Sequence, residues 1–177
     1  MPMISSKNNG VHSLRLPFCE KGFSLLEVLI AVIVLAIGLL GIGGLQVLSL
    51  KNNHSAYLRS QATYLAYDII DSIRVNPDGI ASYATAATDA PASHQSCEST
   101  TANCTTAQMV THDLNIWKCS LGGWDSHATC TTLGITGLLP GGTGVVAVSG
   151  NDVTVTVAWI DDRDGTSTTS LAVSTRI

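Results

Sequence analysis

The stretch "KGFSLLEVLIAV", Lys21 to Val32, places one acidic residue, Glu27, close to the start of a long apolar run. From Phe23 to Leu50 there are 28 residues, and Glu27 is the only ionisable side chain among them. As an α-helix the run would extend about 42 Å, at about 1.5 Å per residue, whereas the hydrocarbon core of a bilayer is about 30 Å thick. The run therefore predicts a membrane-spanning helix rather than the core helix of a soluble protein.

The sequence before this run predicts its orientation. Residues 1–22 carry Lys7, Arg15 and Lys21 against Glu20 alone, and a basic flank tends to stay in the cytoplasm while the C-terminal part crosses the membrane. A secretory signal would have a shorter apolar segment, of about 7 to 15 residues, before a small-residue cleavage site. We therefore expect the apolar helix to stay in the product.

Gly22-Phe23-Ser24-Leu25-Leu26-Glu27, after a short basic leader and before an apolar helix, resembles the processing motif of type IV prepilins. The resemblance implies cleavage between Gly22 and Phe23 by a prepilin peptidase on the cytoplasmic side, followed by N-methylation of Phe23. It also implies a bacterial inner-membrane protein, single-pass with a cytoplasmic N-terminus, that later enters a pilus. A glycine at this place suits cleavage, because it lets a protease approach closely and its poor helix propensity keeps the site extended.

Glu27 needs a partner, because a carboxylate inside a membrane helix costs about 2.5 to 3.5 kcal/mol on insertion scales. Cleavage would create a new cation at the Phe23 amine, one helical turn away. In the family, the equivalent glutamate attracts the N-terminal amine of a neighbouring subunit during filament assembly, and the resemblance implies that role for Glu27. Two alternatives stay open: protonation in lipid, or contact with the headgroups near the cytoplasmic face.

The helix is expected to continue past the membrane as an amphipathic segment over residues 51–76, because one set of apolar residues recurs there every three or four positions. Pro77 then disfavours helix at Asn76, and Asp78-Gly79 favours a turn. Four glycines in the apolar half permit local melting or close helix packing, or reflect how common glycine is in membrane helices. The apolar residues of the amphipathic face are Leu58, Ala62, Leu65, Ile69 and Ile73, and the glycines are Gly38, Gly41, Gly43 and Gly44.

The predicted organisation is thus a cleaved leader (1–22), a membrane or filament-core half of the helix (23–50), an amphipathic half (51–76) and an exported periplasmic head (77–177). Cys19 falls in the leader, so four cysteines remain in an oxidising compartment and predict two disulfides. Four cysteines allow three connectivities. We prefer the two local loops, Cys97 with Cys104 and Cys119 with Cys130.

Within the head, residues 78–105 show no periodicity and are expected to form a long loop, whereas apolar spacing predicts a helix over 106–121. Three strands are predicted over 145–149, 153–160 and 168–175. In the middle strand the alternating apolar residues Val153, Val155, Val157 and Trp159 should face the amphipathic helix. The fold class expected is α+β: a long N-terminal pilin helix packed against a small antiparallel sheet with disulfide-tied loops.

The head narrows the resemblance to PilV-type minor pilins. The similarity rests on Asp113-Leu114, Trp117, Leu139-Pro140-Gly141-Gly142 and Val155-Thr156-Val157-Ala158-Trp159. It implies as partners the prepilin peptidase, other minor pilins and the major pilin, and the inner-membrane pilus assembly machinery. The segment 118–136, with its own cysteine pair, departs from the pattern and looks like an insertion.

The sequence does not favour catalysis. No nucleophile elbow or phosphate-loop pattern occurs, and the five histidines form no pair at metal-ligand spacing. We therefore expect no enzyme activity, no cofactor and no metal. Asp161, Asp162, Asp164 and Gly165 hint at a calcium turn, but a solvated hairpin turn is the better interpretation, because the glutamate that closes an EF-hand is missing.

Charge argues against nucleic-acid binding. Loss of residues 1–22 removes three of nine Lys/Arg and one of thirteen Asp/Glu, leaving a net charge of −6.

The leading hypothesis is a structural protein, a minor pilin that helps to initiate or modify pilus assembly. The alternatives are a minor pseudopilin of a type II secretion system and a pilus-borne adhesin or DNA-uptake subunit.

Overall fold

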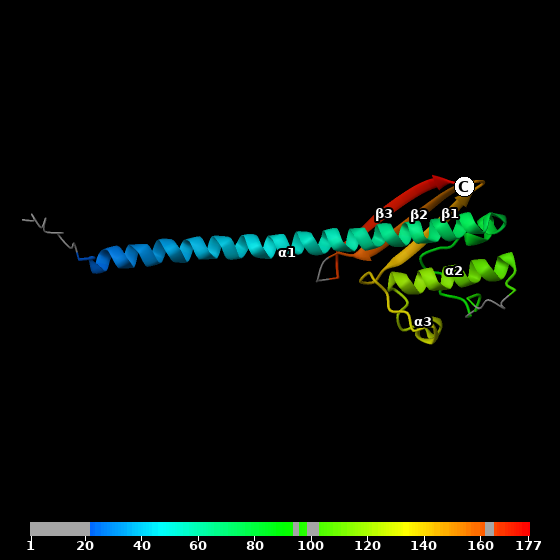
Figure 1. Cartoon of the computed structure of the whole chain (residues 1–177), viewed down its shortest axis with the longest axis horizontal. Coiled ribbons are helices and arrows are strands. Elements are labelled where there is room, and N and C mark those ends of the chain that lie inside the picture. The colour runs from blue at the N-terminus through cyan, green and yellow to red at the C-terminus, as the bar shows by residue number, and fades with distance from the viewer. Residues whose placement is uncertain (1–21, 94–95, 99–102, 162–164) are drawn as a thin grey trace, which may run out of the picture. The chain divides into compact units, whose positions relative to one another are not determined.

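The structure is a computed structural model that describes residues 22–93, 96–98, 103–161 and 165–177 (Figure 1). By contacts the chain divides into two units, one ending at Gln46 and the other spanning Val47–Ile177. The division falls inside helix α1, Leu25–Val75, so each unit contains one half of this helix. The predicted leader, with Lys7, Arg15, Cys19 and Lys21, lies outside the described residues, apart from Gly22.

Both ends of α1 follow from local sequence. At its start the Ser24 hydroxyl accepts a hydrogen bond from the Leu26 N–H at 3.3 Å, which satisfies one of the N–H groups without an intrahelical partner. At its end Pro77 disfavours helical backbone at Asn76 and is the first residue of a 3₁₀ helix, η1, Pro77–Tyr83. The chain therefore changes direction directly after Val75.

Helix α2, Thr106–Leu121, begins with a capping box: the Thr105 hydroxyl accepts from the Gln108 N–H, and the Gln108 side chain accepts from the Thr105 N–H. It ends at Gly122, whose φ of 109° a side chain rarely tolerates. A short helix, α3, Ala128–Leu133, follows.

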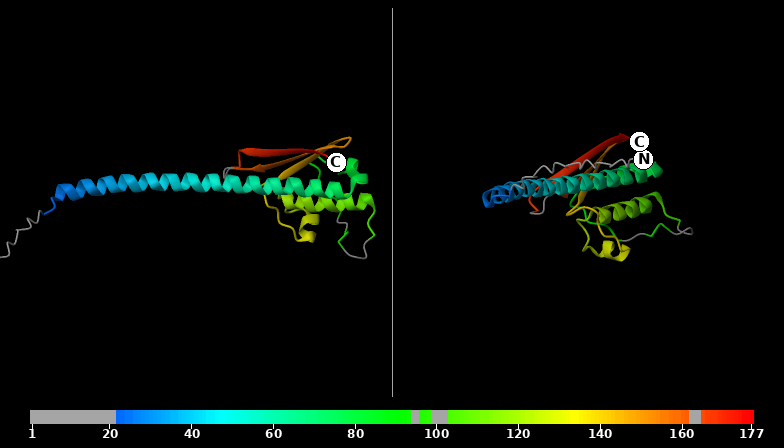
Figure 2. Two further views of the ribbon diagram at one scale, coloured as in Figure 1. Left: turned by 45° about the horizontal axis from the view of Figure 1, so that its top comes forward. Right: turned by 60° about the vertical axis from the view of Figure 1, so that its left-hand side comes forward.

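The sheet has three antiparallel strands in the order β1-β2-β3: Thr143–Ser149, Asp152–Ile160 and Thr168–Arg176. Ser149 pairs with Asp152 across a two-residue turn, where Gly150 has a φ of 61°, as a tight hairpin requires. In Figure 1 and Figure 2, β3 forms one edge of the sheet. At the other edge Thr85 exchanges two backbone hydrogen bonds with Val146 of β1.

One hydrophobic core joins the second half of α1, α2 and the sheet. Trp117 of α2 is part of this core and donates its indole N–H to the Leu65 carbonyl of α1 at 2.9 Å. At the far end of the helix the Tyr83 hydroxyl reaches the Ser72 carbonyl at 3.5 Å. The buried side chains of α1 are Leu58, Ala62, Leu65, Ala66, Ile69, Ile70 and Ile73, and those of β2 are Val153, Val155, Val157 and Trp159.

Most of the predicted elements agree with the structure. The α+β class, the amphipathic face of the long helix, the helix at 106–121 and the three strands are confirmed, with β1 and β2 starting one or two residues earlier than expected. The long loop over 78–105 is wrong in its first part, where η1 and the Thr85 bridge occur. Gly79 makes η1 possible, since a Cβ there would lie 2.8 Å from Val110 Cγ2 of α2.

Candidate functional site

The first candidate site is the junction before α1. Gly22, Phe23 and Ser24 are not helical, and helical backbone begins at Leu25. No heavy atom of the described structure outside its chain neighbours lies within 4 Å of a Cβ built on Gly22. The predicted scissile bond between Gly22 and Phe23 therefore lies in a non-helical, exposed segment, the backbone form that a protease can bind.

Glu27 lies in the first turn of α1, where a negative charge interacts favourably with the helix dipole. It lines a shallow groove together with Phe23, Val28 and Ala31. The structure thus brings the two residues of the predicted assembly site, Phe23 and Glu27, onto the same side of the helix start.

No described part of the chain covers the first half of α1 on any side. All large apolar side chains from Leu25 to Leu50 are at least 51% exposed. This half is long and apolar enough to cross a membrane, and none of its most apolar 18-residue window is buried. Such a helix needs lipid or other protein around it, which is consistent with membrane anchoring and with a place in a filament.

In the second unit the structure contains two disulfides, Cys97–Cys104 and Cys119–Cys130, the pairings preferred from the sequence. They differ in environment, because Cys119 and Cys130 are fully buried whereas Cys97 and Cys104 are half-buried.

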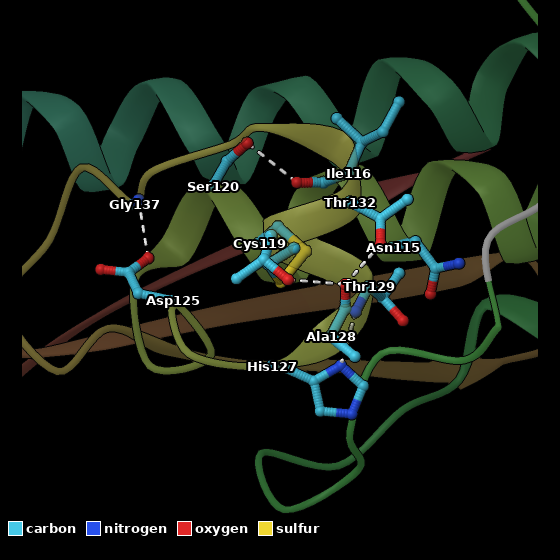
Figure 3. The surroundings of a disulfide bond; sticks show 12 residues. Asn115, Ile116, Cys119, Ser120, Asp125, His127, Ala128, Thr129, Thr132 and Gly137 are labelled. Carbon is cyan, nitrogen blue, oxygen red and sulfur yellow. Dashed lines mark hydrogen bonds between the residues drawn. A yellow bond between two sulfur atoms is a disulfide. The ribbon is translucent and has the colours of Figure 1, made fainter.

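The buried disulfide attaches α3 to α2 (Figure 3). His127 caps α3 by accepting the Thr129 N–H at its Nδ1, and the Thr129 hydroxyl donates to the Ala92 carbonyl at 2.8 Å. On the other side of α3, the Asp125 carboxylate accepts the Gly137 N–H at 2.8 Å. The segment predicted as an insertion is therefore a small ordered substructure.

Lys118 is almost fully buried, which the sequence did not suggest. Its Nζ donates to the Asp89 carbonyl oxygen at 2.9 Å. Burial lowers the pKa of Lys118, and the nearby Asp89 carboxylate opposes that shift. The pKa of Asp89 is lowered chiefly by the hydrogen bond that its carboxylate accepts from the Ala86 N–H. These contacts fix the segment before the first disulfide against α2.

Three carboxylates line a groove of about 320 Å³ between the end of α1 and α2: Asp68, Asp71 and Asp113. Burial raises the pKa of Asp68, and repulsion from the other two carboxylates adds to this. Burial also raises the pKa of Asp113, although its carboxylate accepts a short hydrogen bond from the Tyr83 hydroxyl. Among the described residues no cluster of three or more His, Cys, Asp or Glu side chains is arranged to hold a metal ion.

Sequence reasoning missed one further surface on α1. Tyr57, Tyr64 and Tyr67 are 56%, 62% and 50% exposed. Their spacing of seven and three residues places them on one side of the helix. The same spacing was visible in the sequence, but tyrosine is compatible with both core and surface, so hydropathy alone gave no signal.

Two family models match the chain. A model described as the prokaryotic N-terminal methylation motif matches residues 18–43, and a model described as type IV pilin Tt1218 matches residues 44–115. Neither a curated protein nor a solved structure matches.

The two matched ranges meet without a gap and take in more than half of the 177 residues, including all of α1. The methylation motif implies processing by a prepilin peptidase and pilus assembly. The long N-terminal helix, the three-stranded antiparallel sheet and the two disulfides fit the α+β pilin fold. The chain belongs to the type IV pilin family, whose members are structural subunits.

Proposed function

We propose that this chain is a minor pilin, a subunit that is cleaved between Gly22 and Phe23, methylated at the Phe23 amine and then built into a type IV pilus. The observation that carries the proposal is the match of the methylation motif to residues 18–43, which include most of the helix half that the rest of the described chain leaves exposed. The PilV-type features of the head, Trp117 and Leu139 to Gly142 among them, support a minor rather than a major subunit.

Processing would change the charge at the tip of this helix. Cleavage releases an amine at Phe23, and Glu27 lies one turn further along. In a growing fibre the Glu27 carboxylate of an incoming subunit would pair with the Phe23 amine of its neighbour. This pairing offsets the cost of a carboxylate in an apolar environment, which favours the assembled state over the lone membrane-anchored chain.

The first test is the mature N-terminus. Mass spectrometry of the protein isolated from its native bacterium is expected to find a chain that starts with N-methylated Phe23. A chain that still starts at Met1 would contradict the processing step.

The second test separates processing from assembly. Glu27→Ala is expected to leave cleavage largely intact and to reduce the amount of this chain in sheared pili by about tenfold or more, since its carboxylate no longer pairs with the neighbouring amine. Asp152→Ala, which removes an exposed carboxylate of the head, is the matched control and should not affect incorporation. Normal incorporation of Glu27→Ala would rule out the pairing role.

A minor pseudopilin of a type II secretion system is the second candidate, because pseudopilins share the same helix and processing motif. A deletion strain distinguishes the two. Loss of twitching motility with normal enzyme secretion supports the pilus, and the reverse supports the secretion system.

A further inference from the structure

Strand β3 has one side that pairs with β2 and one that does not. In an antiparallel pair, alternate residues direct their N–H and C=O groups toward the partner strand, and the residues between them direct theirs away. At the two ends of this pair, Asp161 donates its N–H to the Ser167 carbonyl at 3.1 Å, and Ile177 donates to the Asn151 carbonyl at 2.9 Å. Odd-numbered residues of β3 therefore bond to β2, and even-numbered residues direct their backbone groups away from it.

The outward backbone groups of β3 form an open edge of the sheet. Five exposed residues carry them, and no described segment of the chain pairs with them. At the opposite edge, by contrast, Thr85 bonds to Val146 of β1. The described chain thus covers part of one edge with its own backbone and leaves the other available. The residues of the open edge are Thr168, Ser170, Ala172, Ser174 and Arg176.

This edge lacks the features by which soluble proteins protect an unpaired strand. Protected edges are short, or they carry a lysine, a proline or a β-bulge. Strand β3 is nine residues long, pairs with β2 without a bulge, and contains no charged residue before Arg176. An unprotected edge of this length is a template for a further strand, because its N–H and C=O groups recur at the spacing of an extended backbone.

The side chains beside the edge indicate what a further strand would carry. Leu171 and Val173 face the core but are only half-buried at the margin of the sheet. A strand paired with β3 places its own side chains directly opposite these two, on the core side, where apolar residues would complete their burial. On the other side of the sheet Ser170, Ala172 and Ser174 are small and uncharged, so they favour small uncharged residues opposite them.

We propose that β3 binds an extended segment of a different protein as a fourth strand, antiparallel to β3. The segment is uncharged and alternates apolar residues, opposite Leu171 and Val173, with small residues on the outer side. Antiparallel pairing continues the pattern of the existing sheet and is slightly more stable per residue than parallel pairing. The inference goes beyond the proposed function and does not depend on whether the chain works in a pilus or in a secretion system.

The edge of a second copy of this chain does not fit as the fourth strand. The second half of α1 packs on the sheet, so antiparallel pairing of two β3 edges would point the two α1 helices in opposite directions. Copies anchored in one membrane by the same helix point the same way. Parallel pairing fails at equal depth, because it needs an offset of one residue between the outward groups of the two strands. The strand must therefore come from another protein.

The first experiment uses two labelled peptides of one sequence, alternating valine and threonine, with the full chain in detergent. One peptide is N-methylated at its valines and the other at its threonines, so their composition is the same. In the proposed pairing the threonines lie opposite the even-numbered residues and use their N–H groups, whereas the N–H groups of the core-side valines point away from β3. We expect the valine-methylated peptide to bind about tenfold or more tightly by fluorescence anisotropy. Equal binding, or tighter binding of the threonine-methylated peptide, would overturn antiparallel pairing.

A variant of the edge supports this comparison. Ala172→Pro removes one outward N–H, and proline is tolerated where that group faces solvent at a sheet edge. It should weaken the valine-methylated peptide about fivefold or more, whereas Ala172→Thr, which keeps the N–H, is the matched control and should bind as the wild type does. Denaturant unfolding followed by tryptophan fluorescence checks that both variants fold. If the proline variant does not, the two peptides on the wild-type chain decide the question.

The second experiment finds the source of the strand in the native bacterium. The photoreactive residue benzoyl-phenylalanine replaces either Ser174 at the open edge or Ala147, which is exposed on β1 away from that edge. Irradiation at position 174, and not at 147, should give an adduct whose linked peptide, located by mass spectrometry, is an uncharged alternating segment of another protein. Adding Ala172→Pro should reduce the yield about fivefold or more.

The outcomes separate this inference from the proposed function. Adducts to a second copy of this chain, adducts to a charged segment, or no adduct specific to position 174 would overturn the strand pairing and leave the processing and assembly of the chain untouched. A chain that keeps Met1 yet gives the expected adduct would overturn the proposed function alone.

Discussion

Both halves of α1 have a regular helical backbone. They differ in whether the rest of the described chain covers their apolar side chains. Between Leu25 and Leu50 the apolar side chains point in all directions and are exposed. Between Leu58 and Ile73 the aliphatic side chains lie on one side and are buried to 2% exposure or less.

The difference shows that periodicity, and not apolar content alone, indicates what will cover a helix. An apolar stripe can be covered by the head of the same chain, because only one side needs a partner. A helix that is apolar on every side needs lipid or several neighbouring helices around it, because a small head covers only one side. One continuous helix therefore serves two kinds of packing, within the chain and outside it.

A pair of matched substitutions tests this difference most strongly. Ile69→Ala should lower the free energy of unfolding of the second unit by about 2 to 5 kcal/mol, because it opens a cavity in the core. Ile33→Ala, the same change in the uncovered half, should leave that unfolding unchanged. Denaturant unfolding of the full chain in detergent, followed by tryptophan fluorescence, measures both. Equal effects would mean that the two halves do not differ in packing.

The two disulfides extend the comparison into the head. Loop closure alone predicts that each disulfide stabilises the fold by a similar amount, roughly 2.5 to 3 kcal/mol. Replacing Cys119 and Cys130 by alanine should cost more than replacing Cys97 and Cys104, because only the former pair is fully buried in the structure. The half-buried pair should also be reduced first by a small thiol, since the attacking thiolate must reach the sulfur atom. Simultaneous reduction of both would contradict the burial.

A smaller effect is expected from Trp117→Phe, which removes the indole N–H that binds the Leu65 carbonyl. The free energy of unfolding should fall by about 1 to 2 kcal/mol, from the lost hydrogen bond and the smaller ring. Trp124→Phe is the control, because Trp124 is only half-buried and contacts His127 edge-on at 5.8 Å. If the two variants unfold at the same denaturant concentration, the contact of Trp117 with α1 adds nothing.

The smallest effect concerns the charge of the acidic groove. A carboxyl group whose pKa is raised by folding stabilises the fold below its unfolded pKa, and this contribution is lost as the pH rises through the folded pKa. Near pH 7 to 8, Asp68→Asn should therefore increase the free energy of unfolding by less than about 1 kcal/mol, because the group is exposed. The melting temperature should rise slightly. Near pH 3 the difference should vanish. Thermal melts at both pH values measure it, with Asp125→Asn as a control outside the groove.

Much of the fold could be predicted because its elements have regular spacing. The recurrence of Leu58, Leu65 and Ile69 fixed the buried face of α1, and the alternation of Val153 and Val155 fixed the buried face of β2. Pro77 marked the end of the helix within one residue. The cysteine spacing supported two local loops but did not exclude the other connectivities.

What could not be predicted depends on contacts between distant segments. Lysine side chains are mostly exposed, but the ammonium group of Lys118 reaches the Asp89 carbonyl 29 residues away. Asp68 and Asp113 lie 45 positions apart, and only the packing of α2 on α1 brings them to one groove. The predicted calcium turn or hairpin at Asp161 to Gly165 has its central residues, 162–164, outside the described part of the chain.

The first side chain of α1 to enter the core is Leu58, and the Ser55 hydroxyl already donates to Asp161 at 2.9 Å. A protease that cut the helix just after Leu50 would thus shed a water-soluble fragment that retains its whole interior and both cystine bridges. Such a fragment, starting at Lys51, is the natural material for crystallisation or for immunisation, since no detergent would be needed to keep it dispersed.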